Sequence, residues 1–182
     1  MPNSRKKKII YTLLLVLALF LIYAAYVITN PVSPLDTVSF TVDDKDMSIT
    51  YSRPYKKGRL IFGNESESAL VPFDQYWRTG ANRHTVINTN SDLNFYDNVL
   101  SVGQYSLYTI PGLNSWDITF NSTDAFFGIS RPDSEKDLFT ITVPSSQTDE
   151  SIEQFTIDFV TDSLNSNIRL RWDTTEIKIP FK

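Results

Sequence analysis

The distribution of hydrophobic residues divides the chain into two different parts. Residues 9–28 form a run of 20 residues without a charge, and 13 of them are Leu, Ile, Val or Phe. As an α-helix, a run of this length spans about 30 Å, which is the thickness of the hydrocarbon core of a membrane. Beyond residue 35 no amphipathic helical pattern is found, and hydrophobic and polar residues alternate instead.

The alternation after residue 35 has the period of two that a half-buried β-strand requires. It is carried by triplets of apolar residues separated by single residues. The clearest triplets are Phe139, Ile141 and Val143; Phe155, Ile157 and Phe159; Ile168, Leu170 and Trp172; and Ile177, Ile179 and Phe181. About ten short strands, with turn signals about every 8–12 residues, predict an all-β antiparallel β-sandwich of the jelly-roll type.

Two hairpins are predicted within this part of the chain. Residues 84–89 and 92–96 are expected to pair with each other. Residues 104–110 and 116–121 are expected to flank Pro111-Gly112, which fits the central positions of a type II turn. In the last of these strands we expect three residues to face the core and two to face solvent: Trp116, Ile118 and Phe120 against Asp117 and Thr119.

Basic residues before the apolar run predict how the chain is oriented in a membrane. The first eight residues carry four positive charges and no acidic residue. Such flanks stay in the cytoplasm, so the part after the run is exported. The expected organisation is a cytoplasmic basic stub at 1–8, a single-pass transmembrane anchor at 9–28, a Pro-containing linker at 29–35 and an extracytoplasmic (periplasmic) domain at 36–182.

A cleaved signal peptide is the alternative to a membrane anchor. Its apolar region is usually about 7–15 residues long and is followed by a cleavage site of small residues. The run at 9–28 is longer and leads into Tyr26-Val27-Ile28-Thr29. This favours an uncleaved anchor in the inner, cytoplasmic membrane.

Composition and charge exclude several kinds of chemistry. The chain has no cysteine, which excludes disulfides, thiolate catalysis, Cys-ligated zinc and a lipid-modified N-terminal cysteine. Outside the first eight residues, 13 basic and 21 acidic residues give a net charge of −8, which argues against a nucleic-acid partner. No cofactor and no metal is expected. The expected partners are the membrane, through residues 9–28, and a small ligand.

Residues 51–85 stand out because they are basic within an acidic domain, with six basic and three acidic side chains. Arg53, Arg59 and Arg78 lie here, and three guanidinium groups close together would hold a carboxylate or phosphate. The alternative is that each arginine binds backbone carbonyls or the domain's own carboxylates and shapes the loops. Four further residues complete the candidate ligand site: Trp77 and Tyr105 as aromatic walls, Asn82 and His84 as polar groups.

Each of these four residues also has a structural interpretation. The aromatic rings are more often part of a core, and Asn82 more often caps a turn. His84 is the only histidine, so a usual zinc site is excluded unless several carboxylates contribute. No metalloprotease, nucleophile-elbow or phosphate-loop motif is present. Ser52 and Ser106 are conceivable nucleophiles beside His84, without support from their spacing.

Several motifs in order resemble one known family, domain of unknown function 2911 (DUF2911), which occurs largely in Bacteroidetes and related bacteria. The resemblance covers roughly residues 37–181. It rests on Tyr51-Ser52-Arg53-Pro54, Lys57-Gly58-Arg59, Ile61-Phe62-Gly63, Leu70-Val71-Pro72, Trp77-Arg78-Thr79-Gly80-Ala81-Asn82, Gly103-Gln104-Tyr105-Ser106-Leu107, Thr109-Ile110-Pro111-Gly112 and Trp116 with Ile118, Phe120 and Asn121. The resemblance implies an exported β-rich domain and no defined activity. Family members usually have an acidic residue after Gly-Ala-Asn, where this chain has Arg83.

Three functions follow as hypotheses. The first is a membrane-anchored envelope domain that binds a small anionic or sugar-like ligand without catalysis. The second is a hydrolase-like enzyme that uses His84 and an arginine. The third is a structural or protein-interaction domain, in which the motifs only build the fold. An open site lined by the arginines favours the first, and arginines already paired within the domain favour the third.

Overall fold

The apolar N-terminal run forms helix α1, Ser4–Thr29, in a computed structural model that describes residues 4–30, 32–42, 45–123, 130–161 and 166–182. No proline or glycine interrupts this segment, so its backbone hydrogen bonds continue without a break. Among the described residues it is the one helix long and apolar enough to cross a membrane, and its side chains are exposed. The chain divides into two units, residues 1–34 and 35–182.

The second unit is almost entirely β-structure. Its strands are β1 (Leu35–Val42), β2 (Lys45–Ser52), β3 (Phe62–Gly63), β4 (Val71–Pro72), β5 (Thr85–Thr89), β6 (Leu93–Phe95), β7 (Asn98–Leu100), β8 (Gly103–Pro111), β9 (Ser115–Asn121), β10 (Asp137–Thr161) and β11 (Ser166–Phe181). The described helices here are two 3₁₀ turns, Glu65–Glu67 and Ser134–Lys136. The all-β prediction is therefore confirmed.

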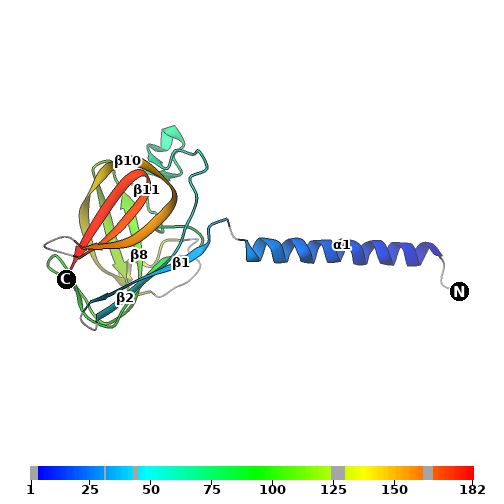
Figure 1. The fold of residues 1–182 in the computed structure, drawn as a ribbon, viewed down its shortest axis with the longest axis horizontal. Helices are drawn as coiled ribbons and strands as arrows, with labels where there is room; N and C mark the ends of the chain where they lie inside the picture. Colours follow the sequence, from blue (N-terminus) through cyan, green and yellow to red (C-terminus); the bar gives the residue numbers. More distant parts are fainter. Residues whose placement is uncertain (1–3, 31, 43–44, 124–129, 162–165) are drawn as a thin grey trace. The chain divides into compact units, whose positions relative to one another are not determined.

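The seven longer strands form a single antiparallel sheet in the order β1-β2-β5-β8-β9-β10-β11 (Figure 1). Neighbours follow chain order, as in a meander, with the small pairs β3-β4 and β6-β7 inserted between them. The sheet curls until its first strands meet its last, so its two halves face each other as the layers of a sandwich do. An isolated bridge joins Tyr55 to Gln154, and the rings of Phe40 and Phe159 lie 5.2 Å apart.

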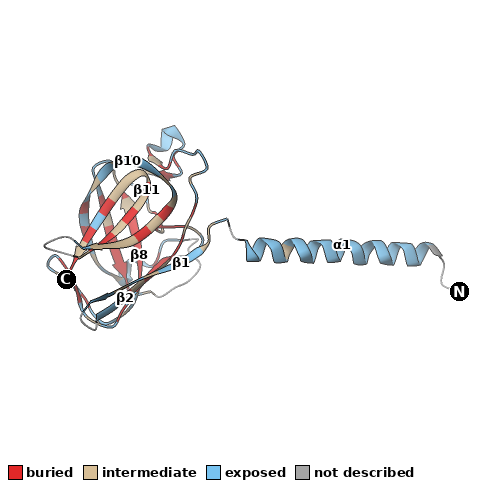
Figure 2. Cartoon of the chain, viewed as in Figure 1, coloured by how far each residue is buried: buried red, intermediate tan, exposed pale blue. Residues whose placement is uncertain are grey.

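The predicted inward-facing triplets form the core, and Figure 2 shows these buried positions along the strands. The two triplets of β11 fall out of phase with each other, because Trp172 and Ile177 are separated by an odd number of positions. The backbone of Asp173 turns into the left-handed region, with φ 53°. This irregularity shifts the alternation, as a β-bulge does, and lets both triplets face the same core.

Two local predictions are wrong. Strand β5 pairs with β2 and β8, whereas the hairpin is formed by β6 and β7. Strand β8 does pair with β9, but Gly112 lacks the positive φ that a type II turn requires at its third position. Instead, Pro111 belongs to β8, and the Gly112 N–H donates to the carbonyl of Ser115 over 2.9 Å.

The packing of β9 gives a test of strand phase. Phe120 is fully buried, with its ring 4.7 Å from Phe95 and 5.0 Å from Phe139. Replacing it by alanine should cost about 3–5 kcal/mol and lower the Tm by about 6–20 °C. Asp117→Ala is the control. It removes one hydrogen bond from Thr142 and should cost only about 1 kcal/mol. Stability is measured by thermal unfolding. If Asp117→Ala loses more stability than Phe120→Ala, the assignment of which β9 residues face the core is wrong.

Candidate functional site

Trp77 anchors the candidate segment in the core and is not a wall of an open site. It is 7% exposed, and its ring stacks at 5.9 Å on Trp172. Its backbone exchanges two hydrogen bonds with Thr109 on β8, of 2.8 and 2.9 Å. The indole N–H donates to the carbonyl of Gly80 over 3.0 Å. The indole thus shapes the loop that follows it.

This loop holds unusual backbone conformations. Thr79 has φ 55°, Gly80 has φ 148° and Asn82 has φ 60°. Asparagine tolerates the left-handed region, whereas a β-branched residue there is a genuine outlier. Thr79 is fully buried, and its hydroxyl lies 3.2 Å from that of Thr109. Strain of about 1–3 kcal/mol per residue persists only where the surroundings enforce it, and such residues cluster at functional sites.

The loop leads to the outer face of the sheet, which is the face directed away from the main core. On this face Ser106 lies opposite Asn121, and Tyr108 lies opposite Thr119. All four are buried, although Thr119 is predicted to face solvent. The prediction of solvent exposure is wrong because residues 130–136 return across this face. Two hydrogen bonds tie this segment down: the Asn121 amide donates to the Asp133 carbonyl over 2.8 Å, and an Arg131 N–H donates to the Tyr108 hydroxyl over 2.7 Å.

Half of the outer face is a polar network that is satisfied within the domain. The Tyr108 hydroxyl donates to Asp137 over 2.7 Å, and the Asn121 amide donates to the other oxygen of Asp137 over 2.8 Å. The Arg131 guanidinium lies 3.6 Å from Asp137 and 5.0 Å from the centre of the Tyr108 ring. Burial and the Asp137 hydrogen bond raise the pKa of Tyr108. This polar network therefore holds residues 130–136 in place across the outer face.

The other half contains Tyr76, Arg78 and His84, called the Arg78 cluster below. The Tyr76 hydroxyl lies 3.4 Å from Nδ1 of His84, and its ring is 5.4 Å from that of Tyr108. Burial raises the pKa of Tyr76 to about 12, so its phenol is protonated at pH 7. Burial and the positive charge of Arg78 lower the pKa of His84, while a hydrogen bond with the Ser130 backbone opposes this. His84 is therefore neutral at pH 7.

Arg78 differs from the other candidate arginines in its contacts. It is half-buried, and within the described part of the chain it makes no hydrogen bond and no ion pair. Arg53, in contrast, binds Asp36 at 3.0 Å, the Phe155 carbonyl at 3.2 Å and the Thr156 hydroxyl at 3.0 Å. Its guanidinium closes the curled sheet.

The remaining candidates lie apart from the Arg78 cluster. Arg59 is exposed and donates to the carbonyls of Tyr55 and Lys56 in its own loop. Tyr105 is half-buried on the core side of β8. Asn82 and Arg83 are exposed in the loop before β5. Of the three arginines expected to converge, Arg53 and Arg59 thus have separate sets of partners, and Arg78 has none among the described residues. Sequence reasoning missed Tyr76, Tyr108, Arg131 and Asp137. Tyr76 and Tyr108 each adjoin a recognised motif, whereas Arg131 and Asp137 do not.

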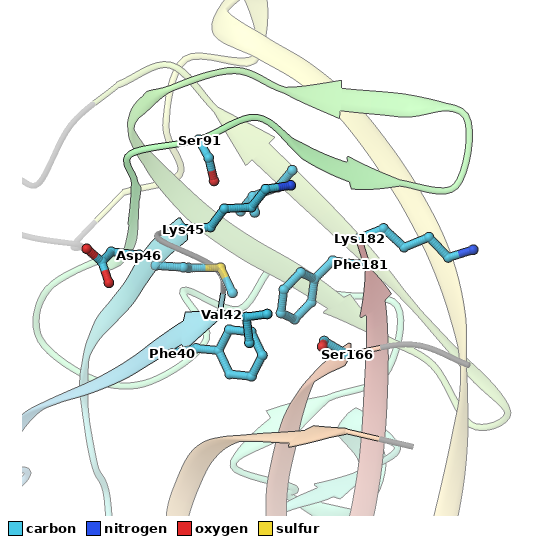
Figure 3. A pocket seen from close by; sticks show the side chains of 10 residues that line it. Phe40, Val42, Lys45, Asp46, Ser91, Ser166, Phe181 and Lys182 are labelled. Carbon is cyan, nitrogen blue, oxygen red and sulfur yellow. The ribbon is translucent and has the colours of Figure 1, made fainter. Parts of the chain in front are cut away.

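Two pockets lie near opposite ends of β8. One lies by the β1–β2 turn, has a volume of ≈ 170 Å³ and is lined largely by apolar side chains, among them Phe40, Val42, Met47 and Phe181. In Figure 3 the Lys182 side chain points away from it. The second lies by Gly112 and has a volume of ≈ 360 Å³. In the described ranges, no group of three acidic or histidine side chains is placed to hold a metal ion.

Two glycine-to-alanine variants test whether the stability of the domain depends on the backbone conformation of the loop after Trp77. At Gly80, a Cβ atom would lie 2.8 Å from the Ser52 carbonyl, at a φ that L-residues rarely adopt. Gly80→Ala should therefore lower stability by roughly 2–4 kcal/mol. Gly58→Ala is the matched control: it also has positive φ, but its Cβ would meet nothing within 4 Å, so it should cost about 1 kcal/mol. Equal losses of Tm in the two variants contradict the close approach at Gly80.

The comparisons with known proteins give one match. The family model described as Protein of unknown function (DUF2911) matches residues 33–181. No curated protein and no solved structure matches the chain. The family match takes in the whole β-sheet, the Arg78 cluster and both pockets, so this chain belongs to the DUF2911 family.

Proposed function

We propose that the β-domain binds a small anion at the Arg78 cluster, without catalysis, while α1 anchors it to a membrane. The observation that carries the proposal is that Arg78 is half-buried and lacks a described partner. It is a half-buried guanidinium without a hydrogen-bond or ion-pair partner among the described residues. A half-buried guanidinium keeps N–H donors that a carboxylate or phosphate can accept from, so a group of opposite charge is its natural complement.

The neighbours of Arg78 support an anion as the ligand. A guanidinium presents a planar fork that binds carboxylate or phosphate through two hydrogen bonds. The protonated Tyr76 hydroxyl is a further donor beside it. Arg131 is already engaged with Tyr108 and Asp137. Among the described residues, Arg78 is therefore a cation of this face without a carboxylate partner.

A hydrolase-like activity has less support. A serine nucleophile requires a base within hydrogen-bond distance, and the buried Ser106 hydroxyl has no hydrogen-bond partner among the described residues. Nδ1 of His84 contacts the Tyr76 phenol, not a serine hydroxyl. A neutral histidine beside a phenol and a guanidinium suits recognition of an anion better than nucleophilic attack.

The position of α1 supports an exported domain. Four basic residues lie in the first eight, directly before the apolar run, and such flanks are retained in the cytoplasm. An uncleaved helix would hold residues 35–182 at the extracytoplasmic face of the inner membrane. A cleaved signal sequence would release the same domain.

An anion panel tests the proposed site. Thermal melts of the full chain in detergent should show that phosphate, sulfate or a small carboxylate raises the Tm of the wild type, because binding to the native state stabilises it. Arg78→Ala should have an unchanged or slightly higher Tm without anion, since it removes a half-buried charge that has no partner among the described residues, and should lose the anion response.

Arg53→Ala is the matched control for the anion panel. It breaks an internal ion pair and two further hydrogen bonds, so it should lower stability by about 1–3 kcal/mol and keep the anion response. A strongly destabilised Arg78→Ala variant, together with a wild type that responds to no anion, contradicts the proposal and favours a purely structural motif.

Membrane fractionation tests the anchor. The full chain should sediment with membranes and resist extraction by high salt or carbonate, because residues 9–28 are uncharged. A protein that begins at residue 35 should remain in the soluble fraction. Recovery of soluble protein whose N-terminus has been shortened after residue 28 would show a cleaved signal sequence instead.

A further inference from the structure

The pocket beside Gly112, called the hairpin-end pocket below, has the size and enclosure of a small-molecule site. Its volume is ≈ 360 Å³, within the range of about 300–1,000 Å³ typical of such sites. It shares no lining residue with the Arg78 cluster. The argument below uses six of its lining residues: Phe62, Phe73, Trp116, Gln147, Asp173 and Thr174.

One wall of the pocket is aromatic and rigid. Phe62 is half-buried, and its ring lies 4.8 Å from that of Trp116 and 5.6 Å from that of Trp77. Phe73 is also half-buried. The faces of aromatic rings carry partial negative charge and attract polarised C–H edges. A ligand with an apolar C–H face can therefore pack here without any rearrangement of the core.

The polar lining residues of the pocket supply hydrogen-bonding groups with free capacity. Oδ1 of Asp173 accepts hydrogen bonds from Lys56 and from Ser151. Within the described part of the chain, Oδ2 of Asp173 accepts none. The Gln147 carbonyl accepts from the Thr174 hydroxyl over 2.8 Å, which orients the amide and leaves its NH₂ group with only a long, 3.5 Å contact to Thr175. An acceptor and a donor thus line the same pocket.

The backbone conformation of Asp173 is a second, independent observation that points to a ligand site in this pocket. Its φ of 53° puts a non-glycine residue into the left-handed region within a strand. Bulges of this kind re-aim side chains and are common next to ligand sites. In β11 the irregularity directs both Trp172 and Ile177 to the core and leaves the carboxylate of Asp173 at the pocket.

We propose that the hairpin-end pocket binds a neutral saccharide of one or two rings. A pyranose combines an apolar C–H face with a rim of hydroxyl groups, and the pocket combines an aromatic wall with acceptors and donors. Its charged lining residues are Glu67 and Asp173, both acidic, and Asp173 is paired with Lys56, so the lining offers no cation to bind an anion. The ≈ 170 Å³ pocket of Figure 3 also has aromatic and polar lining residues, but its volume is below the range of about 300–1,000 Å³.

Calorimetric titration of the full chain tests this proposal, in a detergent without a sugar headgroup. The titrants are glucose, galactose, N-acetylglucosamine and their β-linked disaccharides, with choline and phosphate as non-saccharide probes. At least one saccharide should bind. Gln147→Ala and Phe73→Ala should each weaken its affinity about tenfold or more, because one removes a donor and the other removes aromatic contact area. Gln147 is exposed, so its variant should fold normally.

Two controls separate this site from the proposed anion site. Gln104→Ala changes an exposed glutamine of β8 that does not line the pocket, and Arg78→Ala disables the Arg78 cluster. Both should bind the saccharide with unchanged affinity, whether or not the anion proposal is correct. The saccharide proposal is overturned if no sugar binds at tens of millimolar, if only choline binds, or if Gln147→Ala and Phe73→Ala bind as tightly as the wild type.

Discussion

The burial of Trp77 is the interaction on which the rest of the domain depends. Its ring stacks on Trp172 and contacts the rings of Phe62, Trp116 and Phe155, which come from β3, β9 and β10. Aromatic side chains bury a large area, and edge-to-face contacts add to that stabilisation. Because the indole points into the core, the next residue, Arg78, lies on the other side of its strand-like backbone. The same interaction therefore closes the core and presents the candidate ligand group.

The two faces of the sheet differ in character: the inner face packs apolar side chains, and the outer face carries polar groups. The inner face carries the predicted apolar triplets. The outer face of β5, β8 and β9 is buried too, but with polar groups, because residues 130–136 cover it. Buried polar groups are costly unless they are hydrogen-bonded. Asp137 accepts hydrogen bonds from two of them, Tyr108 and Asn121, and the guanidinium of Arg78 remains outside that network.

Two of the unusual backbone conformations lie at the proposed sites. Thr79 is next to Arg78, and Asp173 is part of the hairpin-end pocket. Each is held in place by buried neighbours: Thr79 by Thr109, and Asp173 by the register of two core triplets on β11. Strained conformations at such positions persist only because tertiary packing enforces them. Both proposed sites therefore depend on the stability of the core.

The sequence by itself determined the class of the fold, the N-terminal helix and the family, because these follow from local patterns. A period of two identifies strands, a long uncharged run identifies a membrane-length helix, and ordered motifs identify relatives. The partner of each strand and of each arginine was decided only by the tertiary structure. Residues 84–89 pair with β2 and β8 rather than with the next strand, and Arg53 binds Phe155 and Thr156, about a hundred positions away. Local alternation carries no information about such distant pairs, which arise when the sheet curls and its two ends meet.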